Sequence, residues 1–128
     1  MRAITVTVPC DPPSALLPNR KRNLHWSAIA KATRELREIA TYAARDQMPN
    51  DWTPFVEPVV LTLTVGYGRR RRVPDLDGSA SACKAALDGM TDAAIITDDR
   101  IIKRLVVEHE KDATGAGYIR LTFSPYRA

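Results

Sequence analysis

Apolar residues recur along the chain with two different spacings, every second residue in some segments and at helical spacing in others. The order of these segments restricts the folds that the chain can adopt. Period-two alternation, which is typical of half-buried strands, occurs at residues 3–8, 59–65, 101–107 and 118–123. Apolar residues at helical spacing occupy residues 27–48 and 80–90, between the first three of these segments. The order β-α-β-α-β-β predicts an α+β fold, in which helices pack against a small mixed sheet.

Turn and cap residues fit between these segments. The proline-rich stretch from Pro9 to Asn23 reads as a loop, and Ser27 and Ser79 are predicted N-caps of the two helices. Pro49-Asn50-Asp51 ends the first helix. A glycine-containing turn at residues 112–117 separates the last two strands, which we expect to form an antiparallel hairpin.

Length and composition indicate one intracellular domain. The 128 residues suit a single domain spanning residues 1–128, and 45% hydrophobic with 27% charged residues is ordinary for a soluble globular protein. Cys10 and Cys83 lack the spacing of zinc ligands and do not suggest a disulfide framework. Because no signal peptide and no apolar run of about 20 residues is found, we expect a cytoplasmic protein with no membrane association.

Positive charge is clustered rather than large in total. The net charge is only +4, but three runs concentrate it: Arg20-Lys21-Arg22, the four arginines Arg69, Arg70, Arg71 and Arg72, and Lys103-Arg104. Such runs can bind the phosphates of a nucleic acid, or they can be solvated loops and edges. The four arginines adjoin a pair of carboxylates, which favours a polyanion-binding role for them.

Asp75-Leu76-Asp77 follows the arginines and is a candidate metal site. If the segment is extended, residues two apart share a side, so both carboxylates point into the same space. A divalent cation would relieve their repulsion, and carboxylate oxygens suit Mg²⁺, with Mn²⁺ as an alternative. The alternative interpretation is that the two aspartates merely end a strand and lead into a helix.

Two further residues of the stretch from Arg69 to Asp99 could complete a site. Asp99 directly precedes a predicted strand, and an adjacent position in the sheet could bring it beside the first two carboxylates. Lys84, on the second predicted helix, could offset charge that develops on a phosphate. The simpler interpretations are a turn at Asp98-Asp99 and a surface ion pair between Lys84 and Asp88, four residues apart.

Two other residues have less specific roles. Trp26 could stack on a base or sugar, although a tryptophan that opens an amphipathic helix is more often part of the core. His109 lies between two glutamates near a strand end, and the sequence suggests no partner for it.

Taken together, DLDG, KAALDGM and ITDD, after an arginine cluster and before an alternating strand, resemble the RusA family of Holliday-junction resolvases, including its phage-encoded members. The upstream segment PSALLPNRKRNLHWS is similar to the N-terminal part of that family. The resemblance therefore extends over nearly the whole chain, and it depends on the order and spacing of several motifs.

The resemblance implies a homodimeric, Mg²⁺-dependent endodeoxyribonuclease that nicks four-way DNA junctions in recombination and repair. Asp75, Asp77 and Asp99 correspond to the family's metal-binding carboxylates, and Lys84 to its catalytic lysine. Two features depart from the family pattern. Gly78 stands where the family usually has Asn, and Lys84 lies seven residues after Asp77 instead of about one helical turn.

Two other classes of function remain open. A metal-dependent enzyme acting on nucleotides could use a DxD motif, but Gly66-Tyr67-Gly68 is too slight for a glycine-rich nucleotide cradle. The chain could also be a non-catalytic DNA-binding module that presents a basic surface. Cleavage of branched DNA, compared with linear duplex, distinguishes the three classes.

Overall fold

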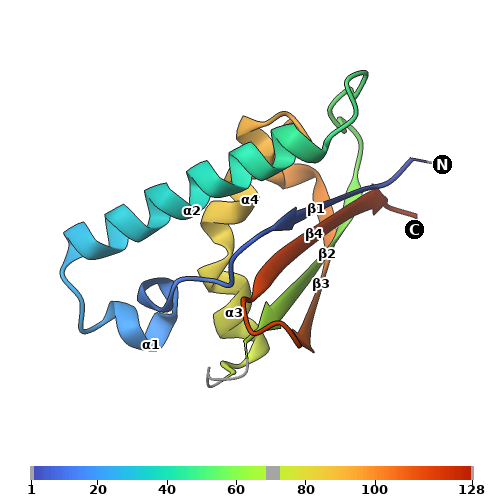
Figure 1. The fold of residues 1–128 in the computed structure, drawn as a ribbon. Helices are drawn as coiled ribbons and strands as arrows, with labels where there is room; N and C mark the ends of the chain where they lie inside the picture. The colour runs from blue at the N-terminus through green and yellow to red at the C-terminus, as the bar shows by residue number, and fades with distance from the viewer. Residues whose placement is uncertain (1, 69–72, 128) are drawn as a thin grey trace.

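The fold is a four-stranded mixed sheet with helices packed against it, in a single α+β domain (Figure 1). The computed structural model describes residues 2–68 and 73–127. The strands are β1 (Ile4–Val8), β2 (Val59–Tyr67), β3 (Ile102–Lys111) and β4 (Tyr118–Pro125). The element order β-α-β-α-β-β agrees with the one predicted from the two hydrophobic periods.

The strand order β1-β4-β2-β3 separates the last two strands of the chain. β2 pairs antiparallel with β4 and parallel with β3, so the predicted β3–β4 hairpin is wrong. β2 is largely buried and takes two neighbours, whereas most of β3 is exposed, which suits an edge. The connection between β3 and β4 passes the end of β2, where the Asp112 backbone N–H donates to the Tyr67 carbonyl oxygen at 3.0 Å.

Two short helices and one long one follow β1. The predicted loop contains the 3₁₀ turn η1 (Ser14–Leu16) and helix α1 (Pro18–Lys21). Helix α2 (Trp26–Gln47) begins one residue before the predicted cap, and its cap is His25, whose Nδ1 accepts a hydrogen bond from the Ser27 backbone N–H at 3.2 Å. The N-terminal part of α2 extends beyond the sheet (Figure 1), and Trp26 is 72% exposed, so the expectation that Trp26 belongs to the core is wrong.

The second predicted helix is two helices. Helix α3 (Leu76–Ala82) and helix α4 (Lys84–Asp92) meet at Cys83, and the 3₁₀ turn η2 (Asp99–Ile101) precedes β3. The N-cap of α3 is Asp75 and not Ser79, because the Asp75 carboxylate accepts the hydrogen bond of a first-turn N–H.

The core lies between one face of the sheet and the helices α2 and α4 (Figure 1). Gly89 of α4 permits the close approach of α2, since a β-carbon there would lie 2.9 Å from the Ala40 side chain. Arg37 and Asp92 join the same two helices at the surface, with 2.5 Å between Arg37 Nε and Asp92 Oδ2. None of the helices in the described part of the chain is long and apolar enough to cross a bilayer.

Candidate functional site

Asp75 and Asp77 lie at the start of a helix instead of on an extended strand. Asp75 Oδ1 accepts a hydrogen bond from the Gly78 backbone N–H at 2.7 Å, and Asp77 occupies the first turn of α3. Asp75 keeps an extended backbone as the N-cap, but Leu76 and Asp77 are helical, so the segment is not extended throughout and the alternative, an entry into a helix, is the one observed. Both carboxylates are exposed, and as anions they suit the N-terminal end of the helix dipole.

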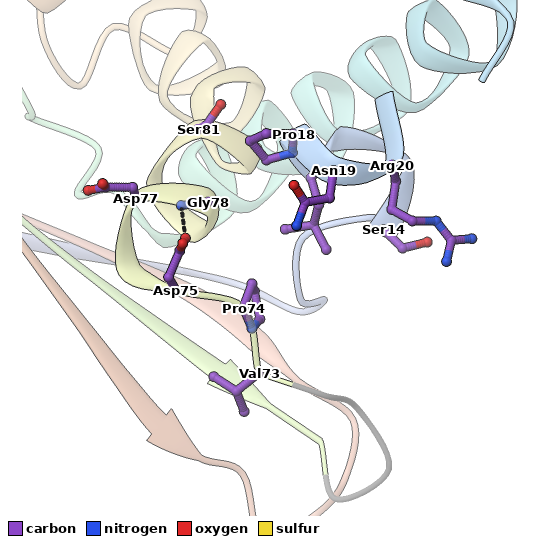
Figure 2. A pocket seen from close by; sticks show the side chains of 11 residues that line it. Ser14, Pro18, Asn19, Arg20, Val73, Pro74, Asp75, Asp77, Gly78 and Ser81 are labelled. Carbon is purple, nitrogen blue, oxygen red and sulfur yellow. Dashed lines mark hydrogen bonds between the residues drawn. The ribbon is translucent and has the colours of Figure 1, made fainter. Parts of the chain in front are cut away.

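The two aspartates nevertheless line one pocket, of about 990 Å³, between α1 and α3 (Figure 2). Asn19 and Arg20 of α1 stand across the pocket from α3, and Asp77 points away from α1. The pocket therefore combines two carboxylates with one guanidinium and small polar groups. The lining residues are Ser14, Leu17, Pro18, Asn19, Arg20, Val73, Pro74, Asp75, Asp77, Gly78 and Ser81.

The structure gives a reason for glycine at position 78 that the sequence did not reveal. A β-carbon at this position would lie 2.8 Å from Asp75 Oδ1, which is too close without a shift of the capping carboxylate. The other neighbours of that β-carbon, Pro18 and Pro74, would be 3.8 Å away. Glycine therefore keeps Asp75, which lines the pocket, in its capping position.

Lys84 and Asp99 form a second cluster at the start of α4. Lys84 Nζ donates hydrogen bonds to Asp99 Oδ2 at 2.6 Å and to Asp88 Oδ1 at 3.0 Å. The hydrogen bond to Asp99 is the largest of the effects that raise the pKa of Lys84, so its amine stays charged at neutral pH. Lys84 thus forms both the surface ion pair expected with Asp88 and a contact with Asp99.

Asp98, the neighbour of Asp99, has a separate partner. Its side chain caps η2 by accepting from the Arg100 backbone N–H at 2.8 Å, and it also binds the Arg100 guanidinium. Hydrogen bonds from Arg100 lower the pKa of Asp98 to about 2. The turn at Asp98-Asp99 therefore directs one carboxylate to Arg100 and the other to Lys84.

The seven-residue spacing between Asp77 and Lys84 spans the junction of two helices, α3 and α4. The intervening residues belong to α3 up to Ala82, and the Cys83 backbone N–H still donates to the Ser79 carbonyl oxygen at 3.1 Å. Seven residues at about 100° each return close to the starting direction. Cys83, with φ of −92° and ψ of 2°, interrupts the helix between α3 and α4, so this rotation does not carry over from Asp77 to Lys84.

Within the described part of the chain, no hydrogen bond or ion pair joins Asp75 or Asp77 to the cluster of Lys84, Asp88 and Asp99. Among residues 2–68 and 73–127, no three His, Cys, Asp or Glu side chains gather closely enough to hold a metal ion. Asp99 is paired with the amine of Lys84 and not with Asp75 or Asp77. The ligand set of Asp75, Asp77 and Asp99 remains a prediction.

A buried polar network lies beneath α3 and was missed from the sequence. Ser79 Oγ is within hydrogen-bond distance of Tyr67 Oη at 2.9 Å and of His109 Nε2 at 2.7 Å. The rings of Tyr67 and His109 meet edge to face with 5.4 Å between their centroids. The alternation of β3 places His109 on the side that faces the helices, and this was the available signal.

The predicted DNA-binding residues fall into two groups. Arg20 and Arg22 are exposed on and just after α1, and Lys21 is half-buried. Arg22 donates to Asn19 Oδ1 at 3.2 Å, and Arg20 lines the pocket. Arg69, Arg70, Arg71 and Arg72 lie outside the described residues.

No protein-family model matches the chain, and no curated protein matches it at a significant level. A functional assignment must therefore rest on the residues of the two clusters and on their chemistry.

Proposed function

We propose that the protein is a Mg²⁺-dependent, structure-selective endodeoxyribonuclease that nicks four-way DNA junctions. The observation that supports this most strongly is the contact between Lys84 and Asp99, 2.6 Å apart. The resemblance to the RusA family had assigned these two residues, fifteen positions apart, to one site. A contact between them is expected if both act on the same phosphate.

The proposed metal ligands have suitable donor chemistry. Asp75 uses one oxygen for its cap and Asp99 uses one for Lys84, which leaves the second carboxylate oxygen of each for an ion. Asp77 makes no hydrogen bond from its side chain to another described residue. Asp75, Asp77 and Asp99 would hold Mg²⁺, or Mn²⁺ in its place, which when bound activates water and stabilises the departing oxygen.

Lys84 supplies positive charge near the reacting phosphate in this proposal. Its amine is held by two carboxylates and remains protonated, since its pKa is raised. An ammonium group so placed can offset the negative charge that develops on a phosphodiester in the transition state. Asp88 and Asp99 would orient the amine while it does so.

Basic residues would hold the DNA backbone beside the site. Arg20 lines the same pocket as Asp75 and Asp77, so a phosphate bound by Arg20 would lie next to the carboxylates. Arg22 and Lys21, and the arginines at 69–72, would extend this contact along the strand. Two copies related by a two-fold axis would match the two equivalent strands of a junction.

Nicking of a synthetic junction in Mg²⁺ tests the proposal. Asp77→Asn removes one carboxylate charge at an exposed position, and we expect nicking to fall strongly while junction binding is kept. Asp51→Asn, at another exposed aspartate, is the matched control and should nick normally. Undiminished nicking by Asp77→Asn would remove the metal site from the proposal.

The same assay separates the alternative functions. A binding module would bind the junction and the linear duplex without cleaving either at matched salt, with or without Mg²⁺. An enzyme acting on nucleotides would hydrolyse free nucleotides in Mg²⁺ and leave both DNA substrates intact. Junction cleavage without comparable duplex cleavage is the result that we expect.

A further inference from the structure

The two edges of the sheet differ in how their outer backbone groups are satisfied. On β1, the Gln47 side-chain amide closes the edge, because Thr7 N–H donates to its Oε1 at 2.8 Å and its Nε2 donates to the Thr7 carbonyl oxygen at 2.7 Å. On β3, the backbone of residues 103–111 makes no hydrogen bond to any described residue outside β2. An open edge of this kind is a template for a further strand.

The charges of β3 are separated by sign except at its last residue, Lys111. Lys103 and Arg104 precede its centre, Glu108 and Glu110 follow it, and apolar residues lie between. Leu105 is 52% exposed and Val106 is 37% exposed, although both lie in the middle of a ten-residue strand. A strand with a basic first half and an acidic second half is complementary to itself when two copies run antiparallel.

The sheet geometry restricts the register of such a pairing. Residues that lie opposite one another across two antiparallel strands must point to the same face, so only residues of equal parity can be paired. Centring the two-fold axis on Val106 places Arg104 opposite Glu108 of the second copy, twice by symmetry. Leu105 then lies opposite Val107 on one face of the joined sheet, and Val106 opposes its own counterpart on the other face.

A register centred on Val107 is less favourable. It would place Lys103 opposite Lys111 of the second copy, which brings two like charges together. It would also place Arg104 opposite Glu110 of the second copy. Glu110 is already engaged by Tyr118 and by Arg120, whose Nη1 lies 3.3 Å from it. Within the described chain, neither Arg104 nor Glu108 has an ion pair of its own.

We propose that β3 is the self-association strand of the protein, and that two copies pair antiparallel through it with Arg104 opposite Glu108 of the second copy. The pairing joins the two sheets into one. The two-fold axis is perpendicular to the sheet, so the helices of both copies lie on the same side. The inference does not depend on the proposed nuclease activity.

Charge reversal tests the pairing in solution. The wild type should have twice the mass of one chain by light scattering, whereas Arg104→Glu and Glu108→Arg should each weaken the dimer at least about tenfold, because both symmetric pairs become repulsive. The double variant exchanges the two charges and should restore the dimer. Restoration also shows that the single variants failed to associate rather than to fold.

A matched control reverses Lys31 and Glu35, an exposed pair four residues apart on α2. Those reversals should leave the mass unchanged. A monomeric wild type, a dimer that is insensitive to the single reversals, or a double variant that stays monomeric would overturn the proposal.

Disulfide formation tests the register. Opposed residues in antiparallel strands have Cα atoms about 4.5–5.5 Å apart, within the range that a disulfide spans. Val106→Cys should therefore cross-link to its counterpart on oxidation. Leu105→Cys should not, because each Leu105 opposes Val107 rather than itself. Cross-linking of the Leu105 variant but not of the Val106 variant would contradict this register.

Discussion

Fifteen residues apart in the chain, Lys84 and Asp99 are in contact, with the lysine Nζ 2.6 Å from the aspartate Oδ2. Lys84 lies at the first position of α4 and Asp99 at the first position of η2. The same amine also contacts Asp88, one helical turn further along α4. A single side chain thus links the helix to the turn that begins β3.

Replacing Lys84 tests whether this link serves the chemistry. If its charge stabilises the transition state, Lys84→Ala should lower junction nicking by about 10²–10³-fold and leave junction binding nearly unchanged. The measurement is single-turnover nicking beside equilibrium binding at the same salt concentration. Lys31→Ala, at another exposed lysine with a carboxylate partner, is the control and should keep both. Equal losses of nicking and binding would assign Lys84 to DNA attachment.

Arg20 and Arg22 allow a test of DNA binding that does not need cleavage. Each phosphate contact that is lost should lower the slope of log affinity against log salt by about 0.9 on duplex DNA. We therefore expect a shallower slope for Arg20→Ala and for Arg22→Ala in a binding titration. Arg100→Ala, at an arginine that pairs with Asp98, should keep the wild-type slope. An unchanged slope in all three variants would give Arg20 and Arg22 a structural role.

The buried network beneath α3 is expected to matter for stability. Ser79→Ala removes the hydroxyl that bonds to Tyr67 Oη and to His109 Nε2, and Ser79 has an exposed fraction of 0%. Each of the two lost hydrogen bonds contributes about 0.5–1.5 kcal/mol, so the free energy of unfolding in urea should fall by about 1–3 kcal/mol. Ser81→Ala, at an exposed serine of the same helix, should change it little. Equal effects of the two variants would argue against the network.

Local patterns predicted the strands and the order of elements because burial on one face imposes period-two alternation on residues such as Leu61 and Leu63. They did not predict which strands pair. That choice depends on comparing whole strands: β2 is largely buried and takes two neighbours, while β3 is exposed and takes one. The hairpin expectation used only the short turn at residues 112–117.

The candidate site was predicted in part. Residue types and spacing singled out Asp75 and Asp77, while topology and the family resemblance singled out Asp99 and Lys84; the fold brings Lys84 and Asp99 together and places the other two beside one pocket. The helical backbone of Leu76 and Asp77 was foreseen only as the alternative, because a capping aspartate and one inside a strand are both extended and differ only in the backbone that follows. His109 was missed since its partner, Ser79, is thirty residues away in the chain.

The end of α4 offers a stabilising substitution. Ala94 has φ of 64°, in the left-handed region, and the helix ends with Ile95 N–H bonded to the Met90 carbonyl oxygen at 2.9 Å, the pattern in which glycine is preferred. Ala94→Gly should raise the free energy of unfolding by about 1 kcal/mol. Ala93→Gly, at an ordinary helical φ of −83°, should lower it instead. Thermal or urea unfolding of both variants measures the difference, and a loss of stability in Ala94→Gly would contradict the assigned backbone.

Asp98 gives the chain an acid-dependent contribution to stability. Because the hydrogen bonds from Arg100 lower the pKa of Asp98 to about 2 from an ordinary 3.8, the folded state favours the carboxylate. The contribution is present above pH 3.8 and is lost as the pH falls toward 2. Arg100→Gln should shift the Asp98 titration, followed by its carboxyl NMR signal, toward the ordinary value. The melting temperatures of this variant and the wild type should differ at pH 5 and converge near pH 2, and a wild-type midpoint near 3.8 would refute the pairing in solution.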